Sequence, residues 1–534
     1  MKAITCFILI LYGGLLFCSS APDTLYILET TDIHGFIYPY DYINDTEFDG
    51  GLARIYTLVK KYRARSDKVI LLDGGDMLQG TPLADYYNKI LPADSNPFIE
   101  IMNFMEYDAF TVGNHDIEQG QEIYDRARAQ SHFPWLAANA LLAGGSVYFD
   151  PYIIINLNGV RIGILGLTTP SIPSYMDESF YPGIIWGDMV PTAEKYASLL
   201  RPNVDILVGL FHAGFIAEEP LCSPVANASG IIAEQTPGFD IICAGHSHRP
   251  LPLEFTETKG AAETARINAG DRGKYLGIVR IIYQQDDSGF KMISRQTWLE
   301  SATQVEPAAE ILDIALPYHK ATLTYINTIL TYTEEPLSTY NAWFQDNPLV
   351  DMINLLQLHI TQADISFTTC FDTAINIEPG PVLIKHAYAL YPYYNFLYTM
   401  KLNGQQIKDY LEYSARFYQV VNDTLRAVDD IPGYYCDFAE GISYYINPEE
   451  SYGNRIIITG MDEGSMPFAL DRQYTVAMNS FRASGGGGFI TAIKASSQDI
   501  IYRNHIDITS LIIEHLRSVD KLVPQITRNW EIRY

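Results

Sequence analysis

Residues 24–35, TLYILETTDIHG, decide the fold of this chain, because an apolar run leads directly into Asp32 and His34. The apolar, β-rich composition of residues 25–28 is typical of a buried strand. An Asp-x-His sequence directly behind a strand has two interpretations. It is either a turn that caps the strand end or one half of a metal site.

The same pattern recurs five times before residue 250. Each time an apolar run ends in polar residues, in KVILLDGGD (68–76), AFTVGNHD (109–116), RIGILGLTT (161–169), DILVGLFHAG (205–214) and DIICAGHSH (240–248). Stretches able to form helices, such as 51–65 and 97–105, separate these runs. The alternation predicts a layered α/β domain whose polar strand ends converge at one edge of a sheet, where ligands bind in open α/β folds.

The strand ends supply a mixed nitrogen and oxygen ligand set, which suits divalent metals such as Zn, Mn, Co or Fe. The seven candidate ligands are Asp32, His34, Asp76, Asn114, His212, His246 and His248. Seven ligands suit two ions, and two cations about 3.5–4 Å apart need a shared anion. Asp76, in the middle of the order, is the candidate bridge. Each motif alone fits a turn, but their joint occurrence in this order favours a metal site.

This set of motifs, DxH, GDxxQG, GNHD, HxG and GHxH, resembles the signature of the calcineurin-like metallophosphoesterases, and within them the two-domain 5′-nucleotidase group. The resemblance implies an N-terminal four-layer αββα catalytic domain with two metals and a C-terminal α/β domain that supplies a nucleoside pocket. It implies that the first metal is bound by Asp32, His34, Asp76 and His248, and the second by Asp76, Asn114, His212 and His246. It also implies that His115, next to Asn114, faces the scissile phosphate.

The C-terminal half is most similar to the 2′,3′-cyclic-nucleotide 2′-phosphodiesterase/3′-nucleotidase branch. The segments that carry this resemblance are 391–418, IPGYYCDFAEGISYYI (431–446) and NSFRASGGGGF (479–489). In that branch two aromatic rings sandwich the base, which implies Phe481 as one ring and Tyr434 as the other, with Tyr435 as a competitor. Core packing is the alternative role for each ring, and we expect it for most of the 38 tyrosines.

Two departures separate the chain from the 5′-nucleotidases. Gly487 stands where they carry an aspartate that contacts the ribose, and TTCFDTAIN (368–376) replaces a segment that contains an arginine. Glu118, three residues after His115, is placed to orient the imidazole and raise its pKa. We hypothesise that these two residues form a catalytic dyad.

The resemblance implies a dinuclear metal-dependent hydrolase that converts 2′,3′-cyclic nucleotides to 3′-nucleotides, and 3′-nucleotides to nucleosides and phosphate. A broad 5′-nucleotidase or nucleotide-sugar hydrolase is the first alternative. A secreted binding protein on a retired hydrolase scaffold is the second, and the complete ligand set argues against it. The net charge of −27 argues against binding to a nucleic acid polymer or an anionic membrane. We expect a nucleotide substrate and a monomer or dimer.

Composition and pattern divide the 534 residues into four segments. Residues 1–21 combine a lysine, an apolar stretch and small residues, which predicts a signal peptide and a secreted or periplasmic protein. Cys18 allows the alternative of a lipoprotein. Residues 22–305 are the predicted catalytic domain, 306–335 a linker helix broken near Pro317, and 336–534 the nucleotide-binding domain.

Four cysteines follow the signal segment, namely Cys222, Cys243, Cys370 and Cys436. Export permits disulfides, and the preferred pairing within each domain joins Cys222 to Cys243 and Cys370 to Cys436. Buried free thiols are the equal alternative.

Overall fold

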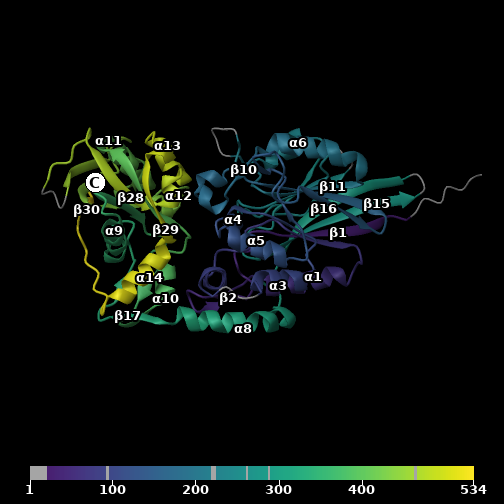
Figure 1. Cartoon of the computed structure of the whole chain (residues 1–534), viewed down its shortest axis with the longest axis horizontal. Helices are drawn as coiled ribbons and strands as arrows, with labels where there is room; N and C mark the ends of the chain where they lie inside the picture. Colours follow the sequence, from purple (N-terminus) through teal and green to yellow (C-terminus); the bar gives the residue numbers. More distant parts are fainter. Residues whose placement is uncertain (1–20, 92–94, 218–223, 260–262, 287–288, 462–465) are drawn as a thin grey trace, which may run out of the picture.

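Two lobes joined by one helix make up the computed structural model, which describes residues 21–91, 95–217, 224–259, 263–286, 289–461 and 466–534 (Figure 1). Residues 1–20 of the predicted signal segment, with Cys18, lie outside the described residues, and so does Cys222 with its expected bridge to Cys243. Within the described ranges, no helix combines the length and the apolar character that a membrane span requires.

The N-terminal lobe is built on a sheet with the strand order β13–β16–β15–β1–β4–β5–β6. Its parallel part consists of β1 (Asp23–Thr30), β4 (Val69–Asp73), β5 (Ala109–Thr111) and β6 (Trp135–Leu136). Antiparallel strands extend the sheet beyond β1, namely β15 (Tyr275–Asp286), β16 (Gly289–Ser301) and β13 (Thr256–Lys259).

A second sheet of the same lobe has the order β14–β12–β11–β9–β8. The parallel strands are β9 (Val160–Thr168), β11 (Ile206–His212), β12 (Ile241–Ala244) and β14 (Ala265–Ile267), and β8 (Tyr152–Leu157) is antiparallel to β9. Every residue of β11 and β12 is buried, as expected for central strands that are covered on both faces.

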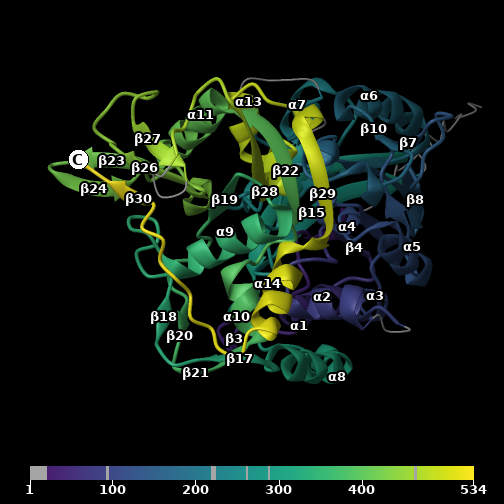
Figure 2. The same cartoon turned by 60° about the vertical axis from the view of Figure 1, so that its left-hand side comes forward.

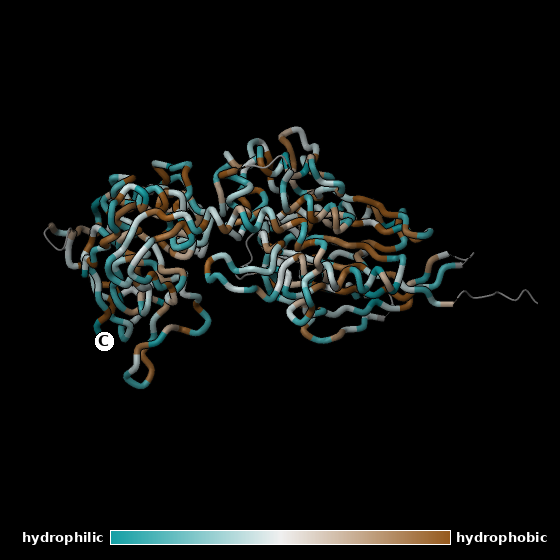
Figure 3. The backbone as a smooth tube through the Cα atoms, turned by 90° about the horizontal axis from the view of Figure 1, so that it is seen from below, coloured by the Kyte–Doolittle hydropathy of each residue, from teal (hydrophilic) through white to brown (hydrophobic). Residues whose placement is uncertain are grey.

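The two sheets pack face to face around an aliphatic core, which includes Leu25, Ile70, Ile164 and Val208. The outer faces are covered by helices, the first by α1 (Leu52–Arg63) and α3 (Pro97–Phe104), the second by α6 (Met189–Leu200) and α7 (Ser229–Gln235). Figure 3 shows the apolar strands running through the middle of this lobe. The predicted four-layer αββα domain is confirmed.

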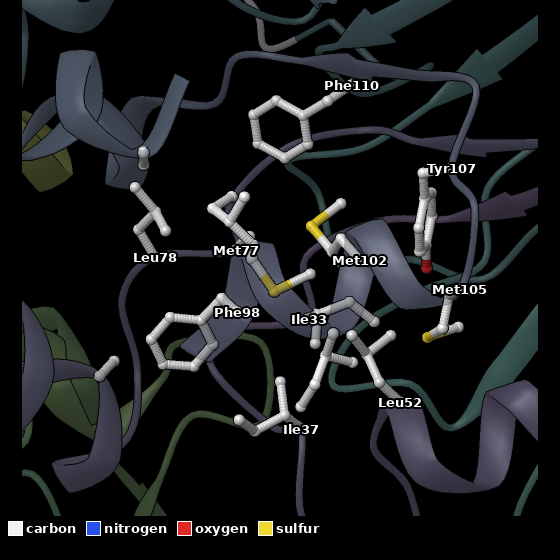
Figure 4. Packing of buried hydrophobic residues seen from close by; sticks show 14 of the residues in the cluster. Ile33, Ile37, Leu52, Met77, Leu78, Phe98, Met102, Met105, Tyr107 and Phe110 are labelled. Carbon is white, nitrogen blue, oxygen red and sulfur yellow. The ribbon is translucent and has the colours of Figure 1, made fainter. Parts of the chain in front are cut away.

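The loops that leave β1 and β4 carry candidate ligands and are anchored by the apolar residues beside them. Ile33, Met77 and Leu78 are almost completely buried. They pack with side chains of α1 and α3, among them Leu52 and Phe98 (Figure 4). Because the anchors are held in a dense core, the backbone that carries the neighbouring polar side chains is held as well.

Helix α8 (Ala309–Ile326) joins the two lobes and runs along one side of the molecule (Figure 1). The prediction that this helix breaks near Pro317 is wrong, because the helix continues through the proline. Pro317 removes the backbone hydrogen bond to the carbonyl of Asp313, but both residues are exposed and water can replace it. On the opposite face, Ile311 and Ala315 are buried against the N-terminal lobe, which stabilises the helix.

The C-terminal lobe is centred on a sheet with the order β25–β19–β28–β22–β29. The strands are β19 (Ile365–Thr369), β22 (Phe396–Asn403), β25 (Asp437–Glu440), β28 (Gln473–Asn479) and β29 (Ile500–Asp507). Helices pack on this sheet (Figure 2), namely α9 (Pro348–Thr361), α11 (Gly404–Ser414) and α14 (Ile508–Ser518). The predicted second α/β domain is confirmed.

The cysteines within the described residues are free, buried thiols. The preferred bridge between Cys370 and Cys436 is therefore wrong. Each of these thiols has another partner. The thiol of Cys370 donates a hydrogen bond to the carbonyl of Asp372 at 3.3 Å, and Sγ of Cys436 lies 2.9 Å from the hydroxyl of Tyr418.

Replacing the proline inside α8 tests how much this helix stabilises the protein. Pro317→Ala restores an N–H group and removes a cost of about 3 kcal/mol for proline in a helix interior, part of which a more flexible unfolded chain offsets. We expect Tm in differential scanning calorimetry to rise by roughly 2–4 °C. Lys320→Ala, also on the exposed face of α8, is the control and should leave Tm almost unchanged. A fall in Tm for Pro317→Ala would contradict the interpretation.

Candidate active site

Two groups of possible metal ligands meet at the edge where the parallel strands of both sheets end. The first group is Asp32, His34 and His248, and the second is Asp76, His212 and His246. Within each group, one ligand atom of every residue lies within 4.8 Å of the others. The ligands lie at or shortly after the carboxyl ends of β1, β4, β11 and β12. Because these ends share one edge, the two sheets bring the two groups together.

In the first group, Nε2 of His34 and Nε2 of His248 are 3.0 Å apart, and Nε2 of His248 lies 3.3 Å from Oδ1 of Asp32. Asp32 also accepts hydrogen bonds from the backbone N–H of His246. Nδ1 of His34 is 3.1 Å from the carbonyl of Gln79. If Nδ1 donates to this carbonyl, the lone pair on Nε2 points to the other members of the group.

In the second group, Nε2 of His212 lies 3.1 Å from Oδ2 of Asp76 and 3.2 Å from Oδ1 of Asn114. Nδ1 of His212 is 2.7 Å from the carbonyl of Gly74, so Nδ1 is the donor, and in the neutral imidazole Nε2 would carry the lone pair that a metal ligand requires. Among the described residues, the buried Oδ2 of Asp76 accepts no hydrogen bond. A buried carboxylate oxygen in this condition is costly unless a cation compensates it.

The backbone of the ligand loops is strained. Five candidate ligands have left-handed conformations with φ between 50° and 69°, namely Asp32, His34, Asp76, His246 and His248. Non-glycine residues rarely adopt this conformation, and clusters of them occur at functional sites. A neighbouring glycine makes room for the loops, since a Cβ at Gly113 would lie 2.1 Å from Oδ1 of Asp76.

Asp116, to which the sequence analysis gave no role, holds the ends of β4 and β5 together. Its carboxylate accepts four backbone N–H hydrogen bonds at 2.9–3.0 Å, from Asp76, Met77, Leu78 and Gly113. Oδ1 of Asp76 in turn accepts the backbone N–H of His115 at 2.8 Å. The aspartate in GNHD could have indicated a structural role for Asp116, but the sequence does not show which backbone N–H groups its carboxylate contacts.

Charge in the second group favours an ionised Asp76. Burial opposes ionisation, but His212 and His115 outweigh it and hold the pKa of Asp76 well below its usual range. Burial and the charge of Asp76 raise the pKa of Asp116 to about 6. Asp76 therefore keeps the negative charge that a ligand shared between two cations requires.

Nδ1 of His115 lies 2.9 Å from Oε1 of Glu118, within the distance of an ion pair. His115 belongs to α4 (Asn114–Ile117), and its ring centroid is 5.3 Å from that of His34. Burial opposes a charged imidazolium, but the charges of Glu118 and Asp76 outweigh it and raise the pKa of His115 to about 10.

The C-terminal lobe carries the three aromatic residues that the resemblance implies. Phe481 lies in α12 (Ser480–Ala483), and Tyr434 and Tyr435 lie in the 3-10 turn Gly433–Tyr435. Tyr434 is 39% exposed, and the rings of the two tyrosines are 5.1 Å apart.

Arg482, which the sequence analysis missed, connects these aromatic residues. Its guanidinium carbon lies 5.5 Å from the ring centre of Tyr435 and 5.7 Å from that of Phe481. The side chain is buried, and its Nε donates to Asp437 at 3.0 Å. A Cβ at Gly487 would lie 2.5 Å from Nη1 of Arg482, so the glycine leaves room for the guanidinium.

Tyr175, on the N-terminal lobe, is a second residue that the sequence analysis missed. Its ring and that of Phe481 are 6.3 Å apart between centroids and inclined by 18°. Its hydroxyl lies 3.5 Å from Nε2 of His246. No pattern in the sequence pointed to this residue, since it lies beyond the strand-end run RIGILGLTT (161–169), which carries no candidate ligand.

The donors of both groups fit divalent metal ions. Each group offers one buried carboxylate and two imidazoles, and Asn114 adds an amide oxygen to the second. This nitrogen and oxygen set suits Zn, Mn, Co or Fe. The residues have the composition to hold two neighbouring ions if Asp76 serves both groups.

A methyl group at Gly113 tests the close approach of the two ligand loops. Because it would collide with the Asp76 carboxylate, we expect Gly113→Ala to weaken metal binding about 10- to 100-fold, the usual cost of disturbing the support of a ligand. Titration of the metal-stripped protein with Mn or Zn measures this affinity. Gly144→Ala is the matched control, since a Cβ there meets nothing within 4 Å. Equal affinities of the two variants would refute the expectation.

Comparisons with known proteins match the two lobes separately. The family model of the calcineurin-like phosphoesterases matches residues 25–250, and that of the 5′-nucleotidase C-terminal domain matches residues 326–495. The chain is 27% identical to the trifunctional nucleotide phosphoesterase protein YfkN of Bacillus subtilis, over 96% of this chain but 39% of that protein. It is 25% identical to the 2′,3′-cyclic-nucleotide 2′-phosphodiesterase/3′-nucleotidase of Yersinia enterocolitica, over 96% of this chain and 88% of that protein.

Solved structures share both lobes. A Staphylococcus aureus protein solved in complex with alpha-ketoglutarate has a TM-score of 0.82 at 21% identity, over 96% of this chain and 100% of the other. The 5′-nucleotidase precursor of Thermus thermophilus has a TM-score of 0.65 at 21% identity, over 96% and 99%. At these identities the likeness shows the fold alone. Residues 25–250 thus belong to a calcineurin-like phosphoesterase domain, which marks the chain as a phosphoric ester hydrolase, and residues 326–495 belong to a 5′-nucleotidase C-terminal domain.

Proposed function

We propose that this protein is a dinuclear metal-dependent nucleotide hydrolase, which converts 2′,3′-cyclic nucleotides to 3′-nucleotides, and 3′-nucleotides to nucleosides and phosphate. The observation that carries the proposal is the position of the two ligand groups beside the aromatic residues of the other lobe, through Tyr175 and Phe481. Three relatives at 25–26% identity, from Yersinia enterocolitica, Haemophilus influenzae and Salmonella typhimurium, bear the name of this double activity and support the choice.

The proposed ligands of the first metal are Asp32, His34, Asp76 and His248, and those of the second are Asp76, Asn114, His212 and His246. Bound there, divalent ions supply Lewis acidity toward a phosphoryl oxygen and toward water. The contacts of His34 with Gln79 and of His212 with Gly74 would hold both imidazoles in the tautomer that presents Nε2.

His115 would supply the proton that the leaving group requires. As water attacks phosphorus and the bond to the ribose oxygen breaks, Nε2 of His115 would donate its proton to that oxygen. The ion pair between Nδ1 and Glu118 would keep the imidazolium charged until then. Phe481, with Tyr434 or Tyr435, would hold the base by stacking, at roughly 1–3 kcal/mol per base.

The glycine run favours this activity over that of a 5′-nucleotidase. The family resemblance places a ribose-binding aspartate of 5′-nucleotidases at the position of Gly487. A side chain there would collide with Arg482, whose guanidinium is held by Asp437 in a buried ion pair. A broad 5′-nucleotidase is nevertheless the alternative that the test must separate, since relatives from Vibrio cholerae and Vibrio parahaemolyticus bear that name.

The setting that we propose is secreted or periplasmic. Residues 1–21 would act as a signal peptide, with a lipid on Cys18 as the alternative. The charge of −27 would repel nucleic acid polymers, which leaves small nucleotides as the substrates.

A substrate panel tests the proposal. Protein stripped of metal and reloaded with Mn, Co, Zn or Fe is given 2′,3′-cyclic AMP, 3′-AMP or 5′-AMP, and products are followed by chromatography and phosphate release. We expect faster turnover of the first two substrates, and none without metal. Dominant hydrolysis of 5′-AMP would establish the 5′-nucleotidase instead. Metal binding without turnover of any nucleotide would favour the retired scaffold.

Removing the charge of Glu118 tests the dyad. Glu118→Gln keeps the size of the side chain but not the ion pair with His115, so we expect kcat on 3′-AMP to fall about 10- to 100-fold. Steady-state kinetics at constant metal loading measure it. Glu122→Gln, on an exposed residue of α5 (Gln121–Gln130), is the control and should behave as the unchanged protein. An unchanged kcat for Glu118→Gln would show that no dyad operates.

A further inference from the structure

Glu29 is an acid inside the aliphatic core between the two sheets of the N-terminal lobe. It lies near the end of β1, and alternate residues of a strand point to the same face. Leu25 and Ile27 belong to the core between the sheets, so Glu29 enters the same layer. Its side chain is completely buried, and neither carboxyl oxygen has a hydrogen-bond partner among the described residues. A carboxyl in this position is costly and calls for a reason.

A glycine on the neighbouring strand provides the space for this carboxyl. Gly277 of β15 is the partner of Glu29 in the register of the two strands. A Cβ at Gly277 would lie 2.7 Å from Oε2 of Glu29 and 3.1 Å from Cδ1 of Ile267, on β14 of the second sheet. The carboxyl therefore reaches from the first sheet toward the second. Glycine inside a strand often marks such a close approach.

Charge and burial keep the Glu29 carboxyl protonated. Burial and the charges of Asp32 and Asp73 raise the pKa of Glu29 well above its usual range. The backbone N–H groups of Ala244 and Ala269 act in the opposite direction, so they are close to the carboxyl, although neither completes a hydrogen bond with it. A carboxyl that is fully buried in an apolar layer is stable in its uncharged form.

The backbone that Glu29 approaches leads directly to Asp32. Ala244 ends β12 and precedes the loop that carries two candidate ligands, of which His246 donates its N–H to the Asp32 carboxylate at 3.0 Å. Beyond β14, the N–H of Arg272 donates to the carbonyl of Asp32 at 2.8 Å. Asp32 itself follows Glu29 by three residues. The carboxyl of Glu29 therefore lies where three segments around the candidate ligands come together.

We propose that Glu29 is a positioning residue of the candidate metal site, whose carboxyl sets the distance between the ligands that follow β1 and those that follow β12. Because the layer around it is closely packed, a change in the size or polarity of this side chain moves the two strand ends relative to each other. An apolar side chain of the same volume would fill the layer without approaching the N–H groups. The inference deepens the proposed function, since it rests on the proposed metal site but not on the choice of nucleotide.

Two substitutions at Glu29 separate its polar group from its volume. Titration of the metal-stripped protein with Mn or Zn gives the Kd for metal, and amide hydrogen exchange of the metal-free protein reports on residues 245–248 without catalysis. We expect Glu29→Met to weaken metal binding about 10- to 100-fold and to speed exchange in this loop. Glu29→Gln keeps the shape and a carbonyl oxygen, and its Kd should stay within about threefold of the unchanged protein.

A methyl group at Gly277 tests the same contact from the neighbouring strand. Because it would meet Oε2 of Glu29 at 2.7 Å, Gly277→Ala should weaken metal binding in the unchanged protein. In a Glu29→Ala background the methyl group meets no carboxyl, and the same change should cost much less affinity. The two changes are therefore expected to be non-additive. Additive losses would show that Gly277 does not act through Glu29 and would contradict the inference.

Leu25→Ala is the matched control, since Leu25 points into the same layer from the same strand but lies near the start of β1. It should lower Tm through lost packing but leave the Kd for metal unchanged. If it weakens metal binding as much as Glu29→Met does, the effect is a general loss of stability and the inference is wrong. It is also wrong if Glu29→Met binds metal as tightly as the unchanged protein, or if Glu29→Gln loses as much affinity as Glu29→Met.

These outcomes are distinct from a failure of the proposed function. Normal metal affinity in Glu29→Met, together with nucleotide turnover by the unchanged protein, would overturn the inference and leave the proposed function intact. If the unchanged protein binds no metal, the proposed function fails, and the inference fails with it.

Discussion

The carboxylate of Asp116 is the interaction on which the candidate site depends. It accepts backbone N–H groups from the loop after β4 and from the turn after β5, and so joins two strand ends. Without it, the N–H groups of Asp76, Met77 and Leu78 would be buried and unpaired, at a cost of about 1–3 kcal/mol each. The same bonds place Asp76 where its carboxylate meets His212 and the N–H of His115. One buried acid thus determines where the proposed bridging ligand lies.

The strained backbone of the ligand loops follows from the need to bring the ligand side chains together. Side chains from two sheets can converge only if the chain turns sharply after each strand, and five candidate ligands do so with positive φ. Each such residue costs of order 1–3 kcal/mol and persists because its surroundings hold it. Here the surroundings are the buried anchors Ile33, Met77 and Leu78 and the close approach at Gly113. The apolar core beneath the loops therefore stabilises a polar arrangement that the loops alone would not keep.

The two lobes contribute different parts of the proposed reaction site. The catalytic lobe offers acids and imidazoles, and the C-terminal lobe offers aromatic rings around a buried arginine and aspartate pair. One of the places where the lobes meet is a loop that carries Tyr175, fixed on one side by apolar anchors and on the other by Asp177 and Phe180. A chain with a net charge of −27 can still attract an anionic substrate there, because metal ions would dominate the local field.

The sequence by itself determined a layered α/β domain and the set of polar residues at its strand ends, because apolar runs and their polar ends are local patterns that recur along the chain. The four-layer αββα arrangement followed from the resemblance of the motifs to a known family. The sequence did not determine that α8 continues through Pro317, because packing against the N-terminal lobe decides this. It also did not determine that Cys370 and Cys436 are free thiols. The roles of Asp116, Arg482 and Tyr175 were also decided only by tertiary structure. Each of them acts through contacts with residues distant in the sequence or on another strand, and such contacts leave no local pattern.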